Sequence, residues 1–305
     1  MIGRLLVEML ISRGATDRIA SLDDPSRAHS KAEFSRVNLL RFDDCLAVCD
    51  GMDMVFQVAG IKGSPAVTAA KPASIFVPLI TMNTNMMEAA RSKGVKRYLF
   101  TSTIGVYAPA DVFYEDSVWA TFPSQNDRFG GWAKRMGELQ AEAYRIEFKW
   151  DEIAIVRPAN VYGPFDNFRL EDAMVIPSLI RRAVDGEDPL VVWGDGTPVR
   201  DFIHARDVAA GMLVAMEAMP AKPVNLGCGE GVSIRQIVDI IVKHLPAKPK
   251  IVWDTSKPAG DKQRLMDISR ARAMGWSPRI SLNEGIADVM DWYRNNRERA
   301  MKRYD

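Results

Sequence analysis

Short apolar runs alternate along the first half of the chain with stretches whose apolar residues recur at helical spacing. Met54–Gly60 is an almost uninterrupted apolar run, which is typical of a strand buried on both faces of a sheet. Tyr98–Ser102 and Glu152–Pro158 also read as strands, and helical patterns around Asn83–Lys93 and Lys134 lie between these strands. Strands and helices in alternation predict a doubly wound α/β fold with a parallel sheet.

The chain opens with a helical pattern, and its texture changes near residue 163. Apolar residues at positions 5, 6, 9 and 10 predict a first helix that Gly14 ends, and Arg18–Leu22 reads as a short strand. After Gly163 the predicted elements become shorter, and glycine and proline become denser. We therefore expect a doubly wound part over residues 1–163 and a smaller, partly interleaved α/β lobe over residues 164–305.

Composition narrows the class of protein. The 305 residues are 47% hydrophobic and 26% charged with a net charge of +1, as in ordinary globular enzymes, so no nucleic-acid partner is implied. Cys45 and Cys49 are spaced to share a helix face, but no second Cys or His pair accompanies them, and we expect no metal site. The chain has no apolar run of 18 residues and no signal-peptide pattern, so we expect no membrane span and a cytoplasmic location with reduced thiols.

Two short motifs have the spacing of a catalytic pair. Thr101–Tyr107 places Thr103 four residues before a Tyr, and Gly130–Arg135 follows about two dozen residues later and carries Lys134. This arrangement resembles the active site of the extended short-chain dehydrogenase/reductases, the NAD-dependent epimerase/dehydratase family. Within it, the likeness is greatest to the GDP-L-fucose synthase group and extends over nearly the whole chain. The other matching stretches are Val156–Pro164, Val175–Arg182, Val192–His204, Val224–Gly227, Asp267–Arg270 and Gly275–Pro278.

The resemblance implies a Rossmann-type fold, a nicotinamide cofactor and a nucleotide-sugar substrate. Lys134 would bridge the nicotinamide ribose hydroxyls, and Thr103 would hydrogen-bond the sugar oxygen that is oxidised or reduced. The cofactor would lie along Gly3, Asn38, Ala59, Gly60, Asn83, Pro158 and Asn160. The nucleotide diphosphate of the sugar would meet Asn160, Val175, Arg182, Trp193 and Arg200. An arginine fork matches phosphate oxygens, and a tryptophan face can stack on a base. Each of these side chains also has an ordinary structural interpretation, as a surface arginine, a core tryptophan or a helix-surface amide.

The chain departs from the family pattern at three positions. The phenol that normally acts as general acid and base, four residues before Lys134, is replaced by Gly130. The Cys and His that carry epimerisation in the fucose-synthase pattern are replaced by Gly105 and Met174. Tyr114 could reach the site from a loop, whereas Tyr107 has a structural part in the family. The resemblance therefore implies hydride transfer at the C4 position of a nucleotide-activated hexose, with a GDP-sugar favoured, as an epimerase, dehydratase or reductase, without 3,5-epimerisation.

Two alternatives remain open from the sequence. One is a binding protein for the cofactor or the nucleotide sugar that has lost catalysis together with the phenol. The other concerns the cofactor, because an acidic residue after the second strand selects NAD, whereas Arg or Ser favours NADP. Asp23 favours NAD, although Ser21 and Arg27 are nearby.

The first residues of the chain match only the end of a dinucleotide-binding turn. Met1–Gly3 would be its last three residues, with Gly3 allowing close helix packing, and the expected first strand and two glycines do not appear. We therefore expect the sequence to be an N-terminally truncated form. The resemblance also implies a homodimer formed through a four-helix bundle, with 82–91 and 133–146 as the helical segments involved.

Overall fold

The computed structural model describes residues 1–15, 18–21, 28–61, 65–257 and 261–301. Its helices are α1 (Ile2–Ser12), α2 (Phe42–Cys49), α3 (Pro65–Ala70), α4 (Pro72–Ser92), α5 (Arg128–Phe148), α6 (Val175–Val184), α7 (Ala205–Ala218), α8 (Ile234–Lys243), α9 (Ser269–Ala273), α10 (Leu282–Asn295) and α11 (Arg297–Met301), with short 3₁₀ turns η2 (Ile104–Val106), η3 (Glu115–Ala120) and η4 (Gln125–Asp127). No helix in these segments is long and apolar enough to cross a membrane.

The strands are β1 (Arg18–Ser21), β2 (Glu33–Arg36), β3 (Met54–Gln57), β4 (Arg97–Thr101), β5 (Val112–Phe113), β6 (Ile153–Pro158), β7 (Asn160–Tyr162), β8 (Leu190–Trp193), β9 (Val199–Arg200), β10 (Phe202–His204), β11 (Val224–Leu226), β12 (Val232–Ser233), β13 (Ile251–Asp254) and β14 (Gln263–Met266). The order β11-β6-β4-β3 forms a parallel four-stranded sheet, and β1 and β2 form a separate parallel pair. The predicted parallel α/β architecture is confirmed.

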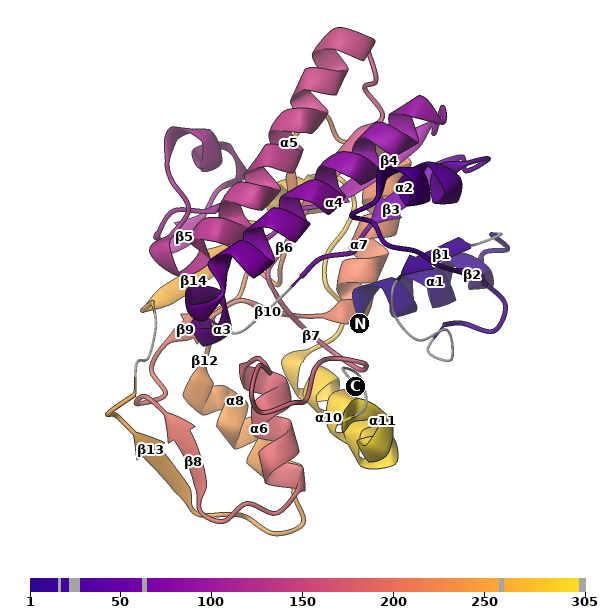
Figure 1. Ribbon diagram of the computed structural model, residues 1–305. Helices are drawn as coiled ribbons and strands as arrows, with labels where there is room; N and C mark the ends of the chain where they lie inside the picture. The colour runs from indigo at the N-terminus through magenta and orange to yellow at the C-terminus, as the bar shows by residue number, and fades with distance from the viewer. Residues whose placement is uncertain (16–17, 22–27, 62–64, 258–260, 302–305) are drawn as a thin grey trace.

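Alternate residues of the central strand β4 enter two different cores. Leu99 belongs to the core that α1 and α7 complete, whereas Tyr98 and Phe100 belong to the core of α2, α4 and α5. Because successive side chains of a strand point to opposite faces, the sheet is covered by helices on both sides. Figure 1 shows α4 and α5 lying side by side across one face, with α7 behind the strands. This two-sided cover is the doubly wound arrangement that the sequence predicts.

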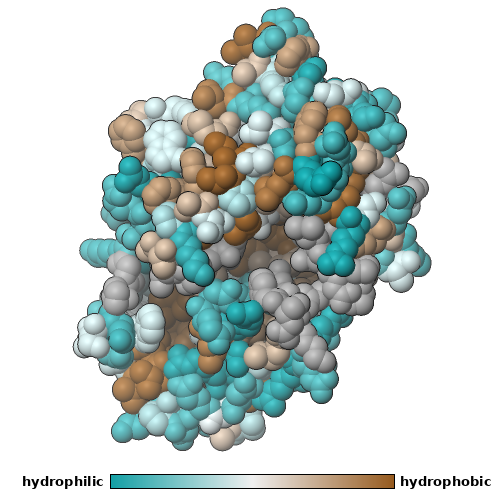
Figure 2. Space-filling view, in the orientation of Figure 1, coloured by the Kyte–Doolittle hydropathy of each residue, from teal (hydrophilic) through white to brown (hydrophobic). Residues whose placement is uncertain are grey.

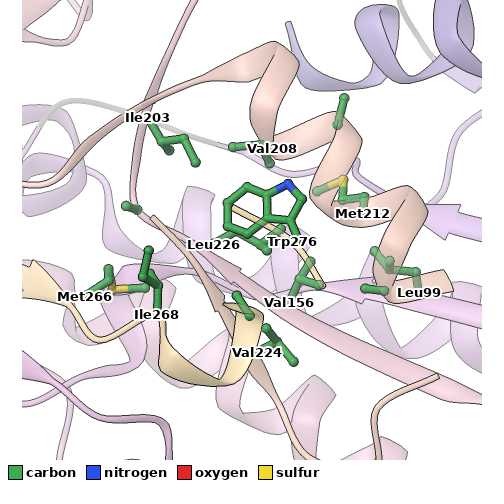
Figure 3. Packing of buried hydrophobic residues seen from close by; sticks show 14 of the residues in the cluster. Leu99, Val156, Ile203, Val208, Met212, Val224, Leu226, Met266, Ile268 and Trp276 are labelled. Carbon is green, nitrogen blue, oxygen red and sulfur yellow. The ribbon is translucent and has the colours of Figure 1, made fainter. Parts of the chain in front are cut away.

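The first of these cores joins segments that are far apart in the sequence. Trp276 packs among Val156, Leu226 and Met212, which come from β6, β11 and α7 (Figure 3). Residues beyond position 163 therefore complete the sheet of the first half: α7 packs against α1, and β11 hydrogen-bonds to β6. A third core lies between α6, α8 and α10 in the lower part of Figure 1.

The expectation that Met54–Gly60 is a strand buried on both faces is wrong. The strand is shorter, Met54 is 47% exposed, and Val55 and Phe56 are only partly buried. In the described residues β3 is hydrogen-bonded to β4 alone, so it is an edge strand of its sheet, and one side of it has no neighbour to cover it. The apolar run correctly predicted a strand but not its position at an edge.

Helix α5 approaches β4 closely through a glycine. A Cβ added at Gly137 would lie 2.3 Å from the ring of Phe100, which is fully buried. A side chain at this position therefore requires the ring or the helix to move. The same helix carries Lys134, so the close approach of α5 also sets the position of that residue relative to the sheet.

We predict that Gly137→Ala destabilises the protein by about 1–3 kcal/mol through overpacking against Phe100. Gly130→Ala, on the same helix, is the matched control, because its Cβ would meet nothing within 4 Å. The control should be neutral or stabilising by up to about 1 kcal/mol, since alanine is the better helix former. Urea unfolding followed by circular dichroism measures both; equal stabilities would show that the Phe100 contact is not limiting.

Candidate functional site

Thr103 stands just beyond the carboxyl end of β4, where a parallel sheet exposes its functional edge. It caps η2, and its Oγ1 accepts a hydrogen bond from the backbone N–H of Gly105 at 3.2 Å. The backbone amide uses the oxygen as an acceptor, so the hydroxyl proton stays available for donation. Thr103 is partly buried at this end of the strand.

Lys134 is buried on α5 with its amino group beside α4. Its Nζ lies 3.4 Å from Oδ1 of Asn83, and the Nδ2 of Asn83 in turn donates to the carbonyl of Ala133. Nζ also lies 4.9 Å from the ring centroid of Phe100. Burial lowers the pKa of Lys134 to about 8, although the charge of Glu138 opposes this shift. Asn83 is therefore a buried orienting amide rather than a helix-surface one.

A buried ion pair lies one helical turn beyond Lys134. Arg157 on β6 donates to both carboxylate oxygens of Glu138, from Nε at 2.9 Å and from Nη2 at 2.6 Å, and both side chains are at most 2% exposed. Ser102, next to Thr103, donates to the same carboxylate at 2.5 Å. Arg157 also donates to the hydroxyl of Tyr107 at 3.0 Å. This network ties α5, β6 and the end of β4 together beneath the site.

Tyr107 is fixed within this network and cannot replace the absent phenol. Its hydroxyl donates to Oδ1 of Asn225 at 2.6 Å and accepts from Arg157, and its ring stacks on Phe113. Burial raises the pKa of Tyr107 to about 12. The structural part expected for this residue is confirmed. Tyr114 is 57% exposed on the loop that follows β5.

The two adjacent glycines at the start of α5 have different surroundings. A Cβ on Gly131 would lie 2.3 Å from the carbonyl oxygen of Gly105, so the helix can approach the Thr103 turn only with glycine there. A Cβ on Gly130 would meet nothing within 4 Å. Packing therefore explains Gly131 but not Gly130, the position where the family pattern has its phenol.

Two arginines lie side by side on neighbouring strands. Arg200 of β9 is in register with Arg264 of β14, and burial, then the charge of Arg264, lowers the pKa of Arg200. Arg264 donates from Nη2 to Oδ2 of Asp127 at 2.7 Å, which links the C-terminal region to the start of α5. Paired guanidinium groups form a favourable site for a diphosphate. Sequence reasoning missed Arg264, which only the β9–β14 register brings to Arg200, and Asp127, which only the ion pair with Arg264 brings to the same place.

The remaining predicted substrate residues lie in the C-terminal lobe. Val175 begins α6, and Trp193 ends β8 with 64% of its surface exposed, so it is not a core tryptophan. Arg182 is held by the carboxylate of Glu187, at 2.7 Å from Nε, and by the carbonyl of Val191. An exposed ring can stack on a base, whereas Arg182 has to leave these partners to meet a phosphate.

The predicted cofactor residues lie on or just after the strands β2, β3, β6 and β7, and on α1, α4 and α5. Gly3 packs α1 against Val58, since its Cβ would lie 3.1 Å from a methyl group of that residue. Asn38 accepts from the N–H of Leu40 at 3.1 Å and shapes the turn after β2. The other members of the set lie as follows: Ala59 and Gly60 after β3, Pro158 at the end of β6, and Asn160 on β7 with its amide donating to the carbonyl of Asp201. Asp23 lies outside the described residues.

These residues fit the nicotinamide end of a dinucleotide. The buried amino group of Lys134 has three N–H donors. Among the described residues it donates one hydrogen bond, to Oδ1 of Asn83. A ribose diol would satisfy the other donors. The face in Figure 2 is hollowed between the upper part, which holds α4 and α5, and the lower lobe. The fold thus brings Lys134 to Asn83, packs α5 against the Thr103 turn, and brings Arg200 to Arg264.

Comparisons with known proteins agree with this geometry. The model of the NAD dependent epimerase/dehydratase family matches residues 1–227. GDP-L-fucose synthase 1 of Arabidopsis thaliana is 30% identical, over 97% of this chain and 91% of that protein. A dTDP-4-dehydro-6-deoxy-D-allose reductase from a Streptomyces species is 27% identical, over 96% of this chain and 93% of that protein. The solved UDP-glucose 4-epimerase of Thermotoga maritima superimposes with a TM-score of 0.85 at 24% identity, over 97% and 96% of the two chains. The chain belongs to the NAD-dependent epimerase/dehydratase family.

We predict that Glu138→Gln destabilises the protein by about 3–5 kcal/mol, because the charge of Arg157 is then buried without a counter-charge. Glu142→Gln, an exposed position on the same helix, is the control and should change stability by less than about 0.5 kcal/mol. Denaturant unfolding gives both values. A Glu138→Gln variant as stable as the control would contradict a structural role for the buried pair.

Proposed function

We propose that the protein is an NAD(P)-dependent enzyme that carries out hydride transfer at C4 of a nucleotide-activated hexose, with reduction of a 4-keto sugar as the reaction to test. The observation that carries the proposal is that α5, which holds Lys134 beside Asn83, packs against the turn that Thr103 begins at the carboxyl end of β4. The reduced nicotinamide, when bound, would supply the hydride. Residues 1–163 would bind the cofactor, and residues 164–305 would hold most of the nucleotide sugar.

The chain's own residues have separate tasks in this proposal. The Thr103 hydroxyl donates to the carbonyl oxygen and fixes the sugar, while Lys134 and Asn83 hold the nicotinamide ribose. Arg200 and Arg264 bind the diphosphate, and the exposed ring of Trp193 offers a face for the base. Gly105 and Met174 carry no group that could move a proton at C3 or C5, so we propose no epimerisation of the fucose-synthase type.

The nucleotide of the sugar and the type of cofactor are finer parts of the same proposal. The relatives' names favour a GDP-linked sugar, and Asp23, which follows β1 in the sequence, favours NAD over NADP.

Homodimers would form through α4 and α5, which pack together and leave Val77, Leu139 and Ile146 exposed. The free thiols of Cys45, Cys49 and Cys228 suit the cytoplasm. A binding protein without catalysis gains no support from relatives that are named as enzymes.

The proposed activity is tested by turnover. We expect GDP- or dTDP-linked 4-keto-6-deoxyhexoses to oxidise NADH or NADPH in the presence of the purified protein, as seen by loss of the reduced-nicotinamide absorbance and by the 4-hydroxy product in mass spectrometry. Thr103→Val removes the hydroxyl without changing the size of the side chain and should lower kcat by roughly 10²-fold or more. A folded protein with no turnover across this panel would refute the proposed function.

The diphosphate site is tested by binding alone. Arg200→Met should weaken GDP binding by about 10–100-fold, because a charge-assisted hydrogen bond contributes about 1.5–3 kcal/mol. Arg272→Met, at an exposed position on α9, is the matched control and should leave the Kd unchanged. Calorimetric titration of GDP into each variant measures this. Equal affinities for the two variants would place the diphosphate elsewhere.

A further inference from the structure

The proposed reduction needs a proton donor, and the described tyrosines do not supply one near Thr103. Tyr98, Tyr107 and Tyr162 are buried in the cores. Tyr144 donates to Glu88, and Tyr293 donates to Asp185. Tyr114 is open to solvent. A proton donor for this site therefore has to come from another type of side chain.

The carboxylates around the site are already committed. Glu138 accepts from Arg157 and Ser102, so both of its oxygens are used. Asp127 packs against Gly105, but its Oδ2 accepts from Arg264 and from Ser124. Both carboxylates therefore act as hydrogen-bond acceptors for an arginine and a serine in this arrangement. Neither group is suited to donate a proton to a carbonyl oxygen.

Lys134 remains, and the groups that face it come from four elements. Asn83 on α4 offers a neutral amide oxygen, and Phe100 on β4 offers a ring face. Glu138, one turn further along α5, is neutralised by Arg157 on β6. The amino group of Lys134 thus lies in an apolar setting without an ion pair of its own among the described residues. Such a setting destabilises the charged form of lysine.

Gly130 leaves open space one helical turn from Lys134. Residues four apart lie on the same face of a helix, so Gly130 stands one turn above Lys134. Its side-chain direction meets nothing within 4 Å, although a glycine inside a helix costs about 1 kcal/mol relative to alanine. The space that a side chain at this position would fill is therefore open, one helical turn from Lys134 and at the end of α5 that packs against the Thr103 turn.

We propose that Lys134 is the general acid and base of this site and acts on the sugar oxygen held by Thr103 across the space beside Gly130. The proposal rests on the proposed function. In reduction the ammonium gives its proton to the carbonyl oxygen, directly or through one water, while the carbonyl carbon receives the hydride of the reduced nicotinamide. The products are the sugar alcohol, the oxidised cofactor and a neutral amine, which regains its proton from solvent. Burial lowers the pKa of Lys134 to about 8, which suits proton exchange near neutral pH.

The first test needs neither cofactor nor substrate. Protein labelled with ¹³C at the lysine ε-carbon is titrated by NMR, and Lys134→Arg identifies the resonance that disappears. We expect this resonance to titrate near pH 8, whereas ordinary lysines titrate near 10.5. A midpoint above 10 in the folded protein would overturn the proposal.

The second test separates proton transfer from cofactor binding. Arginine stays charged throughout the working pH range, so Lys134→Arg should lose about 10²–10⁴-fold in kcat at saturating cofactor, and titration of NADH or NADPH measures the effect on cofactor binding separately. Reduction by the wild type should fall as the pH rises through about 8, because the donor must be protonated. Tyr114→Phe should keep the wild-type kcat, since that phenol is not used.

The outcomes distinguish the inference from the proposed function. A Lys134→Arg variant with wild-type kcat, or a Tyr114→Phe variant that loses activity, overturns the acid–base role of Lys134 while turnover itself survives. Absence of turnover in the wild type overturns the proposed function and the role together, even when the lysine titrates near 8. Gly130→Tyr and Gly130→Phe fill the same space, so both should lower kcat; a tenfold gain for the tyrosine variant alone would show that the phenol, not Lys134, is the better donor.

Discussion

The buried ion pair between Glu138 and Arg157 is the interaction on which the site depends. A charge buried without a partner costs several kcal/mol, so these two side chains hold the helix α5 and the strand β6 in one relative position. Ser102 adds the end of β4 to the same carboxylate. Thr103 follows Ser102 directly, and Lys134 precedes Glu138 by one turn. The relative position of Thr103 and Lys134 therefore follows from a network that contains neither of them.

Glycines let this network form, because they allow α5 to approach the sheet and the Thr103 turn. Gly137 lies on the ring of Phe100, and Gly131 lies on the carbonyl of Gly105. Both contacts leave no room for a side chain. Gly130 differs because a side chain at this position would meet nothing within 4 Å. Helix packing therefore requires glycine at positions 131 and 137 but not at position 130. A site of this shape can work without a phenol only when another group within it exchanges protons.

The sequence predicted the order and type of the main elements in the first half of the chain, because buried strands and amphipathic helices have distinct periods. It also placed Thr103 and Lys134 correctly on a strand end and a helix. It did not predict that β3 lies at a sheet edge, since exposure depends on which strands become neighbours. Arg264 could not be identified either, because its pairing with Arg200 and Asp127 joins residues 64 and 137 positions apart. Local patterns determine elements, whereas contacts between distant strands determine the rest of the site.

The central claim is that this edge of the sheet holds a nicotinamide cofactor. Calorimetric titration of NADH and NADPH into the folded protein tests it directly, with circular dichroism to confirm the fold. The account predicts micromolar binding of one of the two, and Asn83→Leu should weaken it, because the amide that orients Lys134 is then lost. A folded protein that binds neither nucleotide would contradict the account.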